Sequence, residues 1–292
     1  MRVLIAGLGF LGEPLGCHLS SQGHEVVGLT HSAESADRLQ SMHDFSVLAS
    51  DLSDLSVLRA SISNEAPFDC IVHCASSGRG GAERYRAVYF DGVKHLLEVC
   101  PEAKLHYTSS TSVYGQKDGS VVDEASPAKP DRETGQILRA TEDLVMASGG
   151  VVSRLAGIYG PGRFYMLLKF LQKSATIEGD GGRYLNQAHQ SDIVQALTLM
   201  LVNDALRSEI FNVVDSSPQT QQQAYSWLAE HFEGDLPPFV PPDLNRKRGW
   251  THKRVSNAKL LGLGWQPQYP SFQDAVRHDP ELVPSIRALV NS

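Results

Sequence analysis

Three closely spaced glycines near the N-terminus form the pattern in this chain that is best suited to hold a ligand. Gly7, Gly9 and Gly12 follow the apolar run over residues 3–6 and precede a helical stretch over residues 13–21. In such a turn the first glycine permits a sharp bend, the second lets the backbone approach a pyrophosphate, and the third lets helix and strand pack closely. The helix N-terminus adds N–H donors. The pattern predicts a dinucleotide site, and the alternative is a tight turn in another kind of α/β protein.

The segments around this turn alternate between expected strands and expected helices. Further strands are expected over residues 25–29, 46–49, 69–74 and 104–109, and helices around 33–41, 55–64 and 84–99. This alternation predicts an α/β protein with a doubly wound parallel sheet, the Rossmann fold. Ligands of such sheets lie beyond the carboxyl ends of the strands, so the residues there are the cofactor candidates. They are Gly7, Gly9, Phe10, Leu11, Gly12, Thr30, His31, Ser32, Asp51, Leu52, Cys74, Ala75, Ser76, Ser109, Ala156, Gly157 and Tyr159.

The end of the second expected strand indicates which dinucleotide is preferred. Thr30, His31 and Ser32 stand where an NAD-specific chain usually places an acid for the ribose 2′-hydroxyl. A carboxylate would repel a 2′-phosphate, whereas these three side chains can donate hydrogen bonds to one. We therefore expect NADP as the preferred cofactor, with NAD as the alternative. Asp51, after the third strand, is expected either to contact the cofactor or to cap the following helix.

Charge and composition exclude several classes of function. The net charge of −7 argues against binding to nucleic acid, and the short basic cluster of residues 246–248 with Lys253 and Arg254 is expected to be a solvated loop. No apolar stretch approaches the ~20 residues that span a bilayer, and Met1 leads directly into the first strand, so we expect a cytoplasmic protein. The four cysteines, Cys17, Cys70, Cys74 and Cys100, match no metal or redox spacing, so we expect no metal site. Three of them fall in expected core elements, so we expect buried free thiols.

Four motifs, in order along the chain, resemble the extended short-chain dehydrogenase/reductase superfamily, which includes sugar-nucleotide epimerases and dehydratases. After the glycine turn they are the Thr-Ser-Ser-Thr-Ser-Val-Tyr-Gly segment over residues 108–115, the Gly-Asp-Gly segment before His189-x-x-Asp192-Ile-Val, and the Leu-Gly-Trp265-x-Pro segment. The resemblance covers almost the whole chain. It implies a dinucleotide-binding domain over residues 1–160 with 190–214, and a small C-terminal substrate lobe over residues 161–189 and 215–292.

The resemblance also shows which catalytic groups this chain lacks. Ser110 matches the hydroxyl that binds the reacting oxygen of the substrate, although it could instead cap the strand end. Counted back from Glu142, the positions of the family's catalytic tyrosine and lysine are Thr134 and Leu138. A threonine hydroxyl is too weak an acid to protonate an alkoxide at neutral pH, and leucine carries no charge to lower a phenol's pKa. The chain therefore resembles the atypical branch described as NAD-dependent epimerase/dehydratase-like.

Three other residues are candidates for the missing proton donor. Tyr114 follows Ser110 by four residues, His189 has a side chain that titrates near neutral pH, and Tyr159 lies in the loop after the sixth strand. Each could instead have a packing or hydrogen-bonding role. The dehydratases of the family carry an Asp-Glu pair after the hydroxyl, and this chain has Thr111-Ser112 there, so dehydration by that route is not expected.

The substrate lobe implied by the resemblance carries several hydrogen-bond donors for a phosphate or carboxylate. They are Arg163, Arg183, Asn186 and Arg248. The proline-rich stretch over residues 235–243 is expected to be an extended connector within the lobe. The partner is thus expected to be a small molecule rather than nucleic acid or a membrane.

Two functions and two oligomeric states remain open at this point. The chain is expected to be an oxidoreductase or epimerase that acts by hydride transfer on a hydroxylated, sugar- or sugar-nucleotide-like molecule, or else a non-catalytic NAD(P)-binding sensor. Family members commonly dimerise through the helices that correspond here to residues 84–99 and 132–147. Leu138, Leu144 and Val145 offer apolar surface for a homodimer, but they could equally pack on the sheet.

Overall fold

The computed structural model describes residues 1–65, 67–78, 80–244 and 250–290, which form two compact units. The first unit consists of Met1–Val113, Pro130–Arg154 and Val194–Phe211. The second unit consists of Tyr114–Lys129, Leu155–Ile193 and Asn212–Ser292. The chain passes several times between the units, so neither corresponds to a single stretch of sequence.

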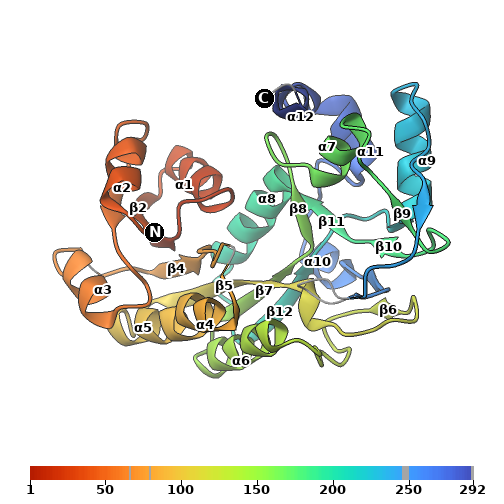
Figure 1. Cartoon of the computed structure of the whole chain (residues 1–292). Coiled ribbons are helices and arrows are strands. Elements are labelled where there is room, and N and C mark those ends of the chain that lie inside the picture. The colour runs from red at the N-terminus through yellow and green to blue at the C-terminus, as the bar shows by residue number, and fades with distance from the viewer. Residues whose placement is uncertain (66, 79, 245–249, 291–292) are drawn as a thin grey trace. The chain divides into compact units, whose positions relative to one another are not determined.

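A seven-stranded parallel sheet with helices on both faces confirms the predicted Rossmann fold (Figure 1). Its strand order is β12-β7-β5-β4-β1-β2-β3. In sequence order the strands are β1 (Arg2–Ala6), β2 (Glu25–Thr30), β3 (Ser46–Ala49), β4 (Cys70–His73), β5 (Lys104–Ser110), β7 (Val151–Leu155) and β12 (Glu209–Val213). The central strands are almost entirely buried, as the apolar runs in their sequences predict, because helices cover both faces.

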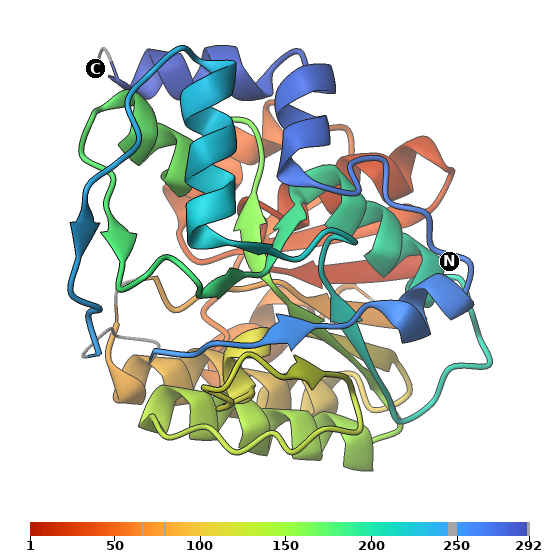
Figure 2. The ribbon, with the colours of Figure 1, turned by 90° about the vertical axis from the view of Figure 1, so that its right-hand side faces the viewer.

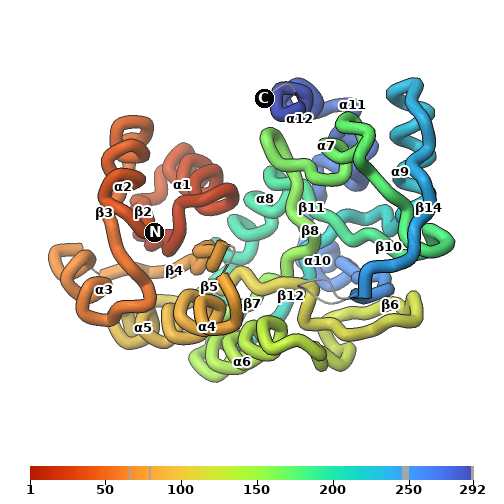
Figure 3. The backbone as a smooth tube through the Cα atoms, in the orientation of Figure 1, coloured from red at the N-terminus to blue at the C-terminus, as the bar shows by residue number. Residues whose placement is uncertain are grey.

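The helices of the first unit connect these strands. They are α1 (Gly12–Ser21), α2 (Ala33–Gln40), α3 (Leu55–Ser61), α4 (Ala82–Tyr85), α5 (Gly92–Val99) and α6 (Glu133–Ala147), and most of α8 (Gln190–Leu201) also belongs here. Figure 3 traces the chain through α1, β2, α2 and β3. Helices α1 and α2 lie on one face of the sheet, and α3, α5 and α6 lie on the other (Figure 1).

The helix expected over residues 84–99 is interrupted. Between α4 and α5 the chain forms a π-helical segment, η1 (Arg86–Asp91), which sequence periodicity did not predict. A one-residue widening of this kind rotates the side chains that follow it relative to those that precede it. It brings Tyr89 into ring contact with Tyr85 and His73, at centroid distances of 5.1 and 5.9 Å.

The hydrogen bonds of two aspartates show which residue caps the helix after β3. The N-cap of α3 is Asp54, whose carboxylate accepts from the backbone N–H groups of Ser56 and Val57. Asp51 instead accepts from the N–H and hydroxyl of Ser53, so it shapes the preceding loop and does not cap the helix. Asp54 lies directly before the helix, where a side-chain oxygen can reach the free N–H groups of the first turn.

The apolar side chains proposed for a homodimer contact are largely used within the chain itself. Leu138 and Val145 of α6 are buried, whereas Leu144 is half-buried. This arrangement corresponds to the alternative left open by the sequence, in which the apolar face of the helix packs on its own sheet. It leaves Leu144 as the one residue of the three with accessible surface for a partner.

The second unit has its own hydrophobic core, built largely from helices. Helices α7 (Tyr165–Leu171), α9 (Gln221–His231), α11 (Phe272–His278) and α12 (Leu282–Val290) pack around it, and Figure 2 shows them gathered together. Its other elements are β6 (Val121–Val122), β8 (Gly157–Tyr159), β9 (Ile177–Glu178), β10 (Tyr184–Leu185), β11 (Gln187–His189), β13 (Gln219–Thr220), β14 (Phe239–Val240), β15 (Arg254–Val255) and α10 (Ala258–Gly262). The 3₁₀ turn η2 (Thr111–Val113) ends the first segment of the first unit.

The observed units divide the chain differently from the predicted domains over residues 114–129. This segment was expected in the dinucleotide-binding domain, but it belongs to the second unit because β6 pairs with β15 in parallel register. The proline-rich connector over residues 235–243 is mostly extended, and its strand β14 pairs with β9. The place of residues 114–129 in the second unit thus depends on pairing between segments that are far apart in the sequence.

The cysteines are free, but they are not all buried as expected. Cys70 is buried, Cys74 and Cys100 are half-buried, and Cys17 is exposed on α1. Within the described residues, no group of His, Cys, Asp and Glu side chains is arranged to hold a metal ion. Nor does any described helix combine the length and apolar character needed to cross a bilayer.

His106 of β5 is expected to make the protein sensitive to acid. The ring is 1% exposed, both of its nitrogens lack hydrogen-bond partners, and burial together with Lys104 and Arg207 lowers its pKa to about 3. An unfolded histidine titrates near pH 6.5. The part of the unfolding free energy that depends on a neutral His106 ring is therefore fully present above that pH and is lost as the pH falls toward 3. Between pH 7 and pH 4 the wild type should lose roughly 3 kcal/mol that a His106→Leu variant retains.

Urea unfolding of both proteins at pH 7, 5 and 4 checks this expectation. Thr198→Val is the matched control, because Thr198 is also buried with an unpartnered side-chain oxygen but does not titrate. Its pH dependence should follow that of the wild type. Equal pH dependence in the wild type and the His106→Leu variant would exclude His106 as the source of the acid sensitivity.

Candidate cofactor site and candidate catalytic residues

The three glycines of the turn after β1 differ in how much room surrounds their backbone. Gly7 has a positive φ of 109°, and a side chain there would place its Cβ 2.5 Å from the backbone of Ala75. A Cβ at Gly12 would lie 2.0 Å from the carbonyl oxygen of Gly7. Gly9, in contrast, has no atom within 4 Å of the position its Cβ would take. The first and third glycines are therefore required for packing, whereas the second leaves backbone open to a ligand.

The end of β2 carries the polar residues expected to choose between the two dinucleotides. His31 is exposed, and its Nδ1 lies 3.8 Å from a carboxylate oxygen of Asp51. Ser32 is the N-cap of α2 and accepts a hydrogen bond from the N–H of Ser35. Burial raises the pKa of Asp51, but hydrogen bonds from Ser53 and the charges of His31 and Arg84 outweigh it and lower the pKa overall.

Several predicted cofactor residues at the ends of β3, β4 and β5 already make hydrogen bonds within the protein. The carbonyl oxygen of Leu52 accepts from His95 Nδ1 at 2.8 Å, and burial raises the pKa of the Cys74 thiol to about 12. Ser76 accepts from the N–H of Gly78. Ser109 is a correction, because its hydroxyl donates to Glu142 Oε1 at 2.6 Å and so points into the core.

Glu142 and Arg154 form a buried ion pair in the first unit. The Glu142 side chain is fully buried and that of Arg154 is 2% exposed, with Nη2 of the arginine 2.7 Å from Oε2 and Nε 3.0 Å from Oε1. Arg139 adds a contact at 3.4 Å. The pair connects α6 to β7, and Ser109 extends the network to β5. Sequence reasoning used Glu142 only to count positions, and it missed this network because nothing local marks its partner.

Ser110, at the end of β5, has a hydroxyl that could donate a hydrogen bond to a substrate oxygen. Its Oγ accepts from the N–H of Ser112 at 3.2 Å, which is the strand-end capping that the sequence left as an alternative. Thr134 and Leu138, the positions predicted for the family's tyrosine and lysine, lie one turn apart on α6. Thr134 is half-buried and Leu138 is buried. Neither residue offers a group that could donate a proton to an alkoxide at neutral pH.

Tyr114, the first candidate for a substitute acid, is held by hydrogen bonds in the second unit. The side chain is buried, and its hydroxyl lies 2.8 Å from the carbonyl oxygen of Asp123 and 2.9 Å from Asn212 Oδ1. A phenol has one proton, and here both neighbours of the hydroxyl are acceptor oxygens of the protein, so that proton is already shared between protein groups. This geometry favours the packing role over the catalytic one.

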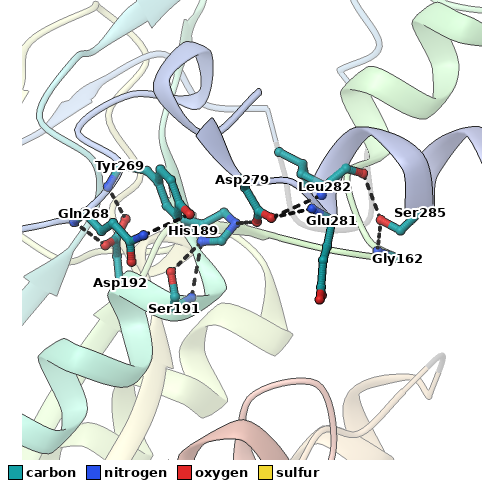
Figure 4. A network of polar contacts seen from close by, with 10 residues as sticks. All are labelled: Gly162, His189, Ser191, Asp192, Gln268, Tyr269, Asp279, Glu281, Leu282 and Ser285. Carbon is teal, nitrogen blue, oxygen red and sulfur yellow. Dashed lines mark hydrogen bonds and ion pairs between the residues drawn. The ribbon is translucent and has the colours of Figure 1, made fainter. Parts of the chain in front are cut away.

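His189, the second candidate, belongs to a polar network within the second unit (Figure 4). Its Nδ1 lies 2.8 Å from the hydroxyl of Ser191, and its Nε2 lies 3.1 Å from Asp279 Oδ2. Burial lowers the pKa of the ring, against the opposing effect of Asp279. In the same network Asp192 accepts from the N–H groups of Gln268 and Tyr269. A histidine with both nitrogens engaged in this way favours the structural alternative.

Tyr159, the third candidate, lies in the core of the second unit. Its strand β8 pairs with β11, and its ring packs against Phe164 and His189 at centroid distances of 4.6 and 5.1 Å. Burial raises the pKa of Tyr159 far above its ordinary value, and Asp215 adds to the effect. The phenol is therefore a weaker acid than a free tyrosine. Gly157 and Ala156, predicted with it as cofactor residues, donate their N–H groups to the carbonyl oxygens of Asn186 and Val213.

The predicted substrate donors have different environments in the second unit. Asn186 is a correction, since its amide donates to the carbonyl oxygen of Lys253 and accepts from the N–H of Val255, which uses both ends of the side chain. Arg183 is largely buried with its Nε 3.4 Å from Glu178 Oε2, and Arg163 is exposed. Arg248 lies outside the described residues.

Lys253 is a residue that sequence reasoning placed wrongly. It was expected in a solvated loop, but it is 3% exposed and donates to the carbonyl oxygen of Tyr114 at 2.8 Å and to Thr251 Oγ1 at 3.0 Å. Burial lowers the pKa of the amine to about 8, and Arg183 adds to the effect. The basic residues beside it in the sequence concealed this position, because a run of charges is usually solvated.

Most of this chain matches one family of known proteins. The sequence model of one protein family, the NAD dependent epimerase/dehydratase family, matches residues 3–213, from the first strand of the sheet to the last. The chain belongs to this family. Membership agrees with the resemblance drawn from the sequence motifs and with the Rossmann fold of the first unit.

Relatives of this epimerase/dehydratase family member cover nearly its full length. Protein YeeZ of Escherichia coli (strain K12) is 29% identical over 92% of this chain and 96% of its own. The 3-diazoavenalumate denitrifying reductase of Streptomyces sp is 26% identical over 94% and 99%. Among solved structures, UDP-glucuronic acid 4-epimerase from Bacillus cereus in complex with NAD matches with a TM-score of 0.80 at 22% identity, over 99% and 100% of the two chains, which shows the shared fold.

Proposed function

We propose that this epimerase/dehydratase family member is an NAD(P)-dependent oxidoreductase or epimerase that acts on a hydroxylated, sugar- or sugar-nucleotide-like small molecule. The observation that carries the proposal is the glycine turn, where Gly7 and Gly12 are fixed by packing and Gly9 is left open. A turn that served only to connect β1 and α1 would not need an open second glycine. Family membership and a relative whose name describes a reductase support the same conclusion.

The residues of the first unit fit a dinucleotide. The open backbone at Gly9 and the N–H groups at the start of α1 would hold the pyrophosphate. Thr30, His31 and Ser32 would donate to a 2′-phosphate, so NADP is the proposed cofactor and NAD the alternative. When bound, a nicotinamide dinucleotide supplies the ability to exchange a hydride with a carbon atom. The hydroxyl of Ser110, whose oxygen accepts from the N–H of Ser112, would orient the substrate oxygen by donating a hydrogen bond to it.

A second candidate function rests on α6. Thr134 and Leu138 remove the usual proton donor, while the geometry of the glycine turn is intact. A protein that binds NAD(P) without turning over a substrate, and that reports its redox state to a partner, would show this combination. Cofactor binding is common to both candidates, so only turnover separates them.

The Ser110→Ala variant tests the catalytic proposal. Calorimetric titration should first show binding of NADP⁺ or NAD⁺ to the wild type. With a panel of sugar nucleotides, sugars and ketones, the wild type should consume or form NAD(P)H, and the variant should lose roughly 100-fold in kcat/KM, as expected for one donor to a developing oxyanion. Ser112→Ala, which alters the neighbouring hydroxyl, should keep the wild-type rate. Cofactor binding without turnover across the panel would support the sensor instead.

A further inference from the structure

Cys17 on α1 is exposed, unlike the other three cysteines, and its thiol lies beside an imidazole. The Sγ atom is 3.5 Å from Nδ1 of His43, and Nε2 of the same ring is 3.0 Å from Oε1 of Glu13. All three residues belong to the first unit. A nucleophile whose neighbouring base is itself oriented by a third group is the arrangement that activates thiols and hydroxyls for covalent chemistry.

The contacts of His43 determine which of its nitrogens can act as a base. A carboxylate can only accept a hydrogen bond, so in the neutral ring Nε2 carries the proton and donates it to Glu13. Nδ1 is then an acceptor, and it faces the thiol of Cys17. The ring also stacks on Phe45, with centroids 4.9 Å apart and planes inclined by 6°. The imidazole is therefore held in the orientation in which Nδ1 can take the proton of the thiol.

The thiol of Cys17 needs this base in order to react at neutral pH. Partial burial raises its pKa, the charge of Glu13 raises it further, and a backbone hydrogen bond opposes these effects without cancelling them. The sulfur therefore keeps its proton until a base removes it. Nδ1 of His43 is within reach of that proton, and the Glu13 carboxylate favours the imidazolium that would form.

His43 is not needed to hold the loop that follows α2. Gln40 already does so, because its amide donates to the carbonyl oxygens of His43 and Phe45, both at 3.3 Å, and accepts from the N–H of Val47 at 2.9 Å. A serine or an alanine in place of Cys17 would leave these hydrogen bonds of the loop unchanged. A structural role thus accounts for the position of the imidazole but not for an exposed thiol beside it.

We propose that Cys17 is a reactive thiol that exchanges with small-molecule disulfides, with His43 as its general base and Glu13 as the residue that positions the base. The inference does not depend on the proposed function, because it concerns a modification of the chain and not the turnover of a substrate. It also needs no cavity, since a small disulfide reaches the exposed sulfur directly from solvent. Access and the removal of the thiol proton are the two conditions for such an exchange.

The proposed exchange balances without a further reactant. The S–H bond of Cys17 breaks as its proton passes to Nδ1 of His43, and the sulfur attacks one sulfur atom of the disulfide. The S–S bond of the reagent breaks while a new S–S bond forms between Cys17 and one half of the reagent. The other half leaves as a thiolate and takes the proton from the imidazolium, which gives a thiol. Cys17 is oxidised to a mixed disulfide, and the leaving half of the reagent is reduced.

The rate at which Cys17 takes up a disulfide tests the proposal. The probe is bis(2-hydroxyethyl) disulfide, which carries no charge that would respond to Glu13. At pH 7, peptide mapping of the fully reduced wild type should show Cys17 modified at least about 10-fold faster than Cys100, whose pKa burial raises to about 11. His43→Phe keeps a ring to stack on Phe45 but supplies no base, so the rate at Cys17 should fall at least about 10-fold. Glu13→Gln should lower it by a smaller factor, because an amide can accept from Nε2 but carries no charge to stabilise the imidazolium.

Two controls separate the loss of the base from a loss of access or of folding. His18→Gln changes the histidine that follows Cys17 on α1 and contacts Gln22, and it should keep the wild-type rate. At pH 10 hydroxide can remove the thiol proton, so the difference between the wild type and His43→Phe should narrow. The inference is overturned if Cys17 reacts no faster than Cys100 or if His43→Phe matches the wild type at pH 7. An equally large difference at pH 7 and pH 10 would also overturn it, because the variant would then have lost access to the sulfur and not its base.

Discussion

Replacing Glu142 by alanine is expected to cost the protein about 3–5 kcal/mol of unfolding free energy, the largest loss that we predict for one substitution. The variant would leave the Arg154 guanidinium, 2% exposed in the native fold, without the carboxylate that it contacts at 2.7 Å. It would also leave the buried hydroxyl of Ser109 without its acceptor. Urea unfolding of the wild type and the Glu142→Ala variant at pH 7 measures this loss of unfolding free energy.

Two further variants separate the cost of breaking this pair from the value of the pair itself. In the double variant Glu142→Leu with Arg154→Met, no charge is left unpaired, so most of the lost stability should return. Glu98→Ala is the matched control, since its pair with Arg59 is exposed, with the side chains 62% and 46% accessible, and should cost at most about 1 kcal/mol. A loss for Glu142→Ala no larger than that of the control would contradict the buried network.

The glycine turn gives the second large expected effect, in which Gly9→Ala and Gly12→Ala differ in kind. A methyl group at Gly9 meets no protein atom within 4 Å, so folding should be unchanged while the Kd for NADP⁺ rises at least 10-fold. A methyl group at Gly12 would approach the Gly7 carbonyl oxygen to 2.0 Å. This clash should cost about 1–3 kcal/mol of stability as well as cofactor binding.

Thermal unfolding and calorimetric titration of the two variants check this difference. Gly262→Ala serves as the control, because its added methyl group also meets open space, on helix α10 of the second unit. It should alter neither property. If Gly9→Ala binds NADP⁺ as tightly as the wild type does, the open backbone is not a pyrophosphate site, and the observation that carries the proposed function is lost.

The features that local sequence encodes were predicted correctly. The glycine spacing after residues 3–6, the alternation of strands with helices and the motifs of the superfamily gave the Rossmann fold and the family, which the sheet order and the match over residues 3–213 confirm. These signals are readable because a turn's backbone conformation and an element's apolar periodicity depend on residues close together in the chain.

The positions of individual polar side chains could not be predicted in this way. Ser109 was expected at the cofactor, but its hydroxyl points to Glu142, which is 33 residues away in the sequence. Asn186 was expected to bind substrate, but its amide holds the main chain at Lys253, 67 residues away. In both cases a partner that is remote in the sequence consumes the hydrogen-bonding group, and no local pattern records such a partner.

The sequence by itself thus determined that this chain folds around a dinucleotide-type turn and that Thr134 and Leu138 stand where an acid and a cation were expected. Only the tertiary structure decided which polar groups are already satisfied and which charge is buried without a counter-ion. Burial and hydrogen-bond satisfaction depend on everything that packs around a side chain, so the same residue type can be a solvated charge or, as at Lys253, a buried amine.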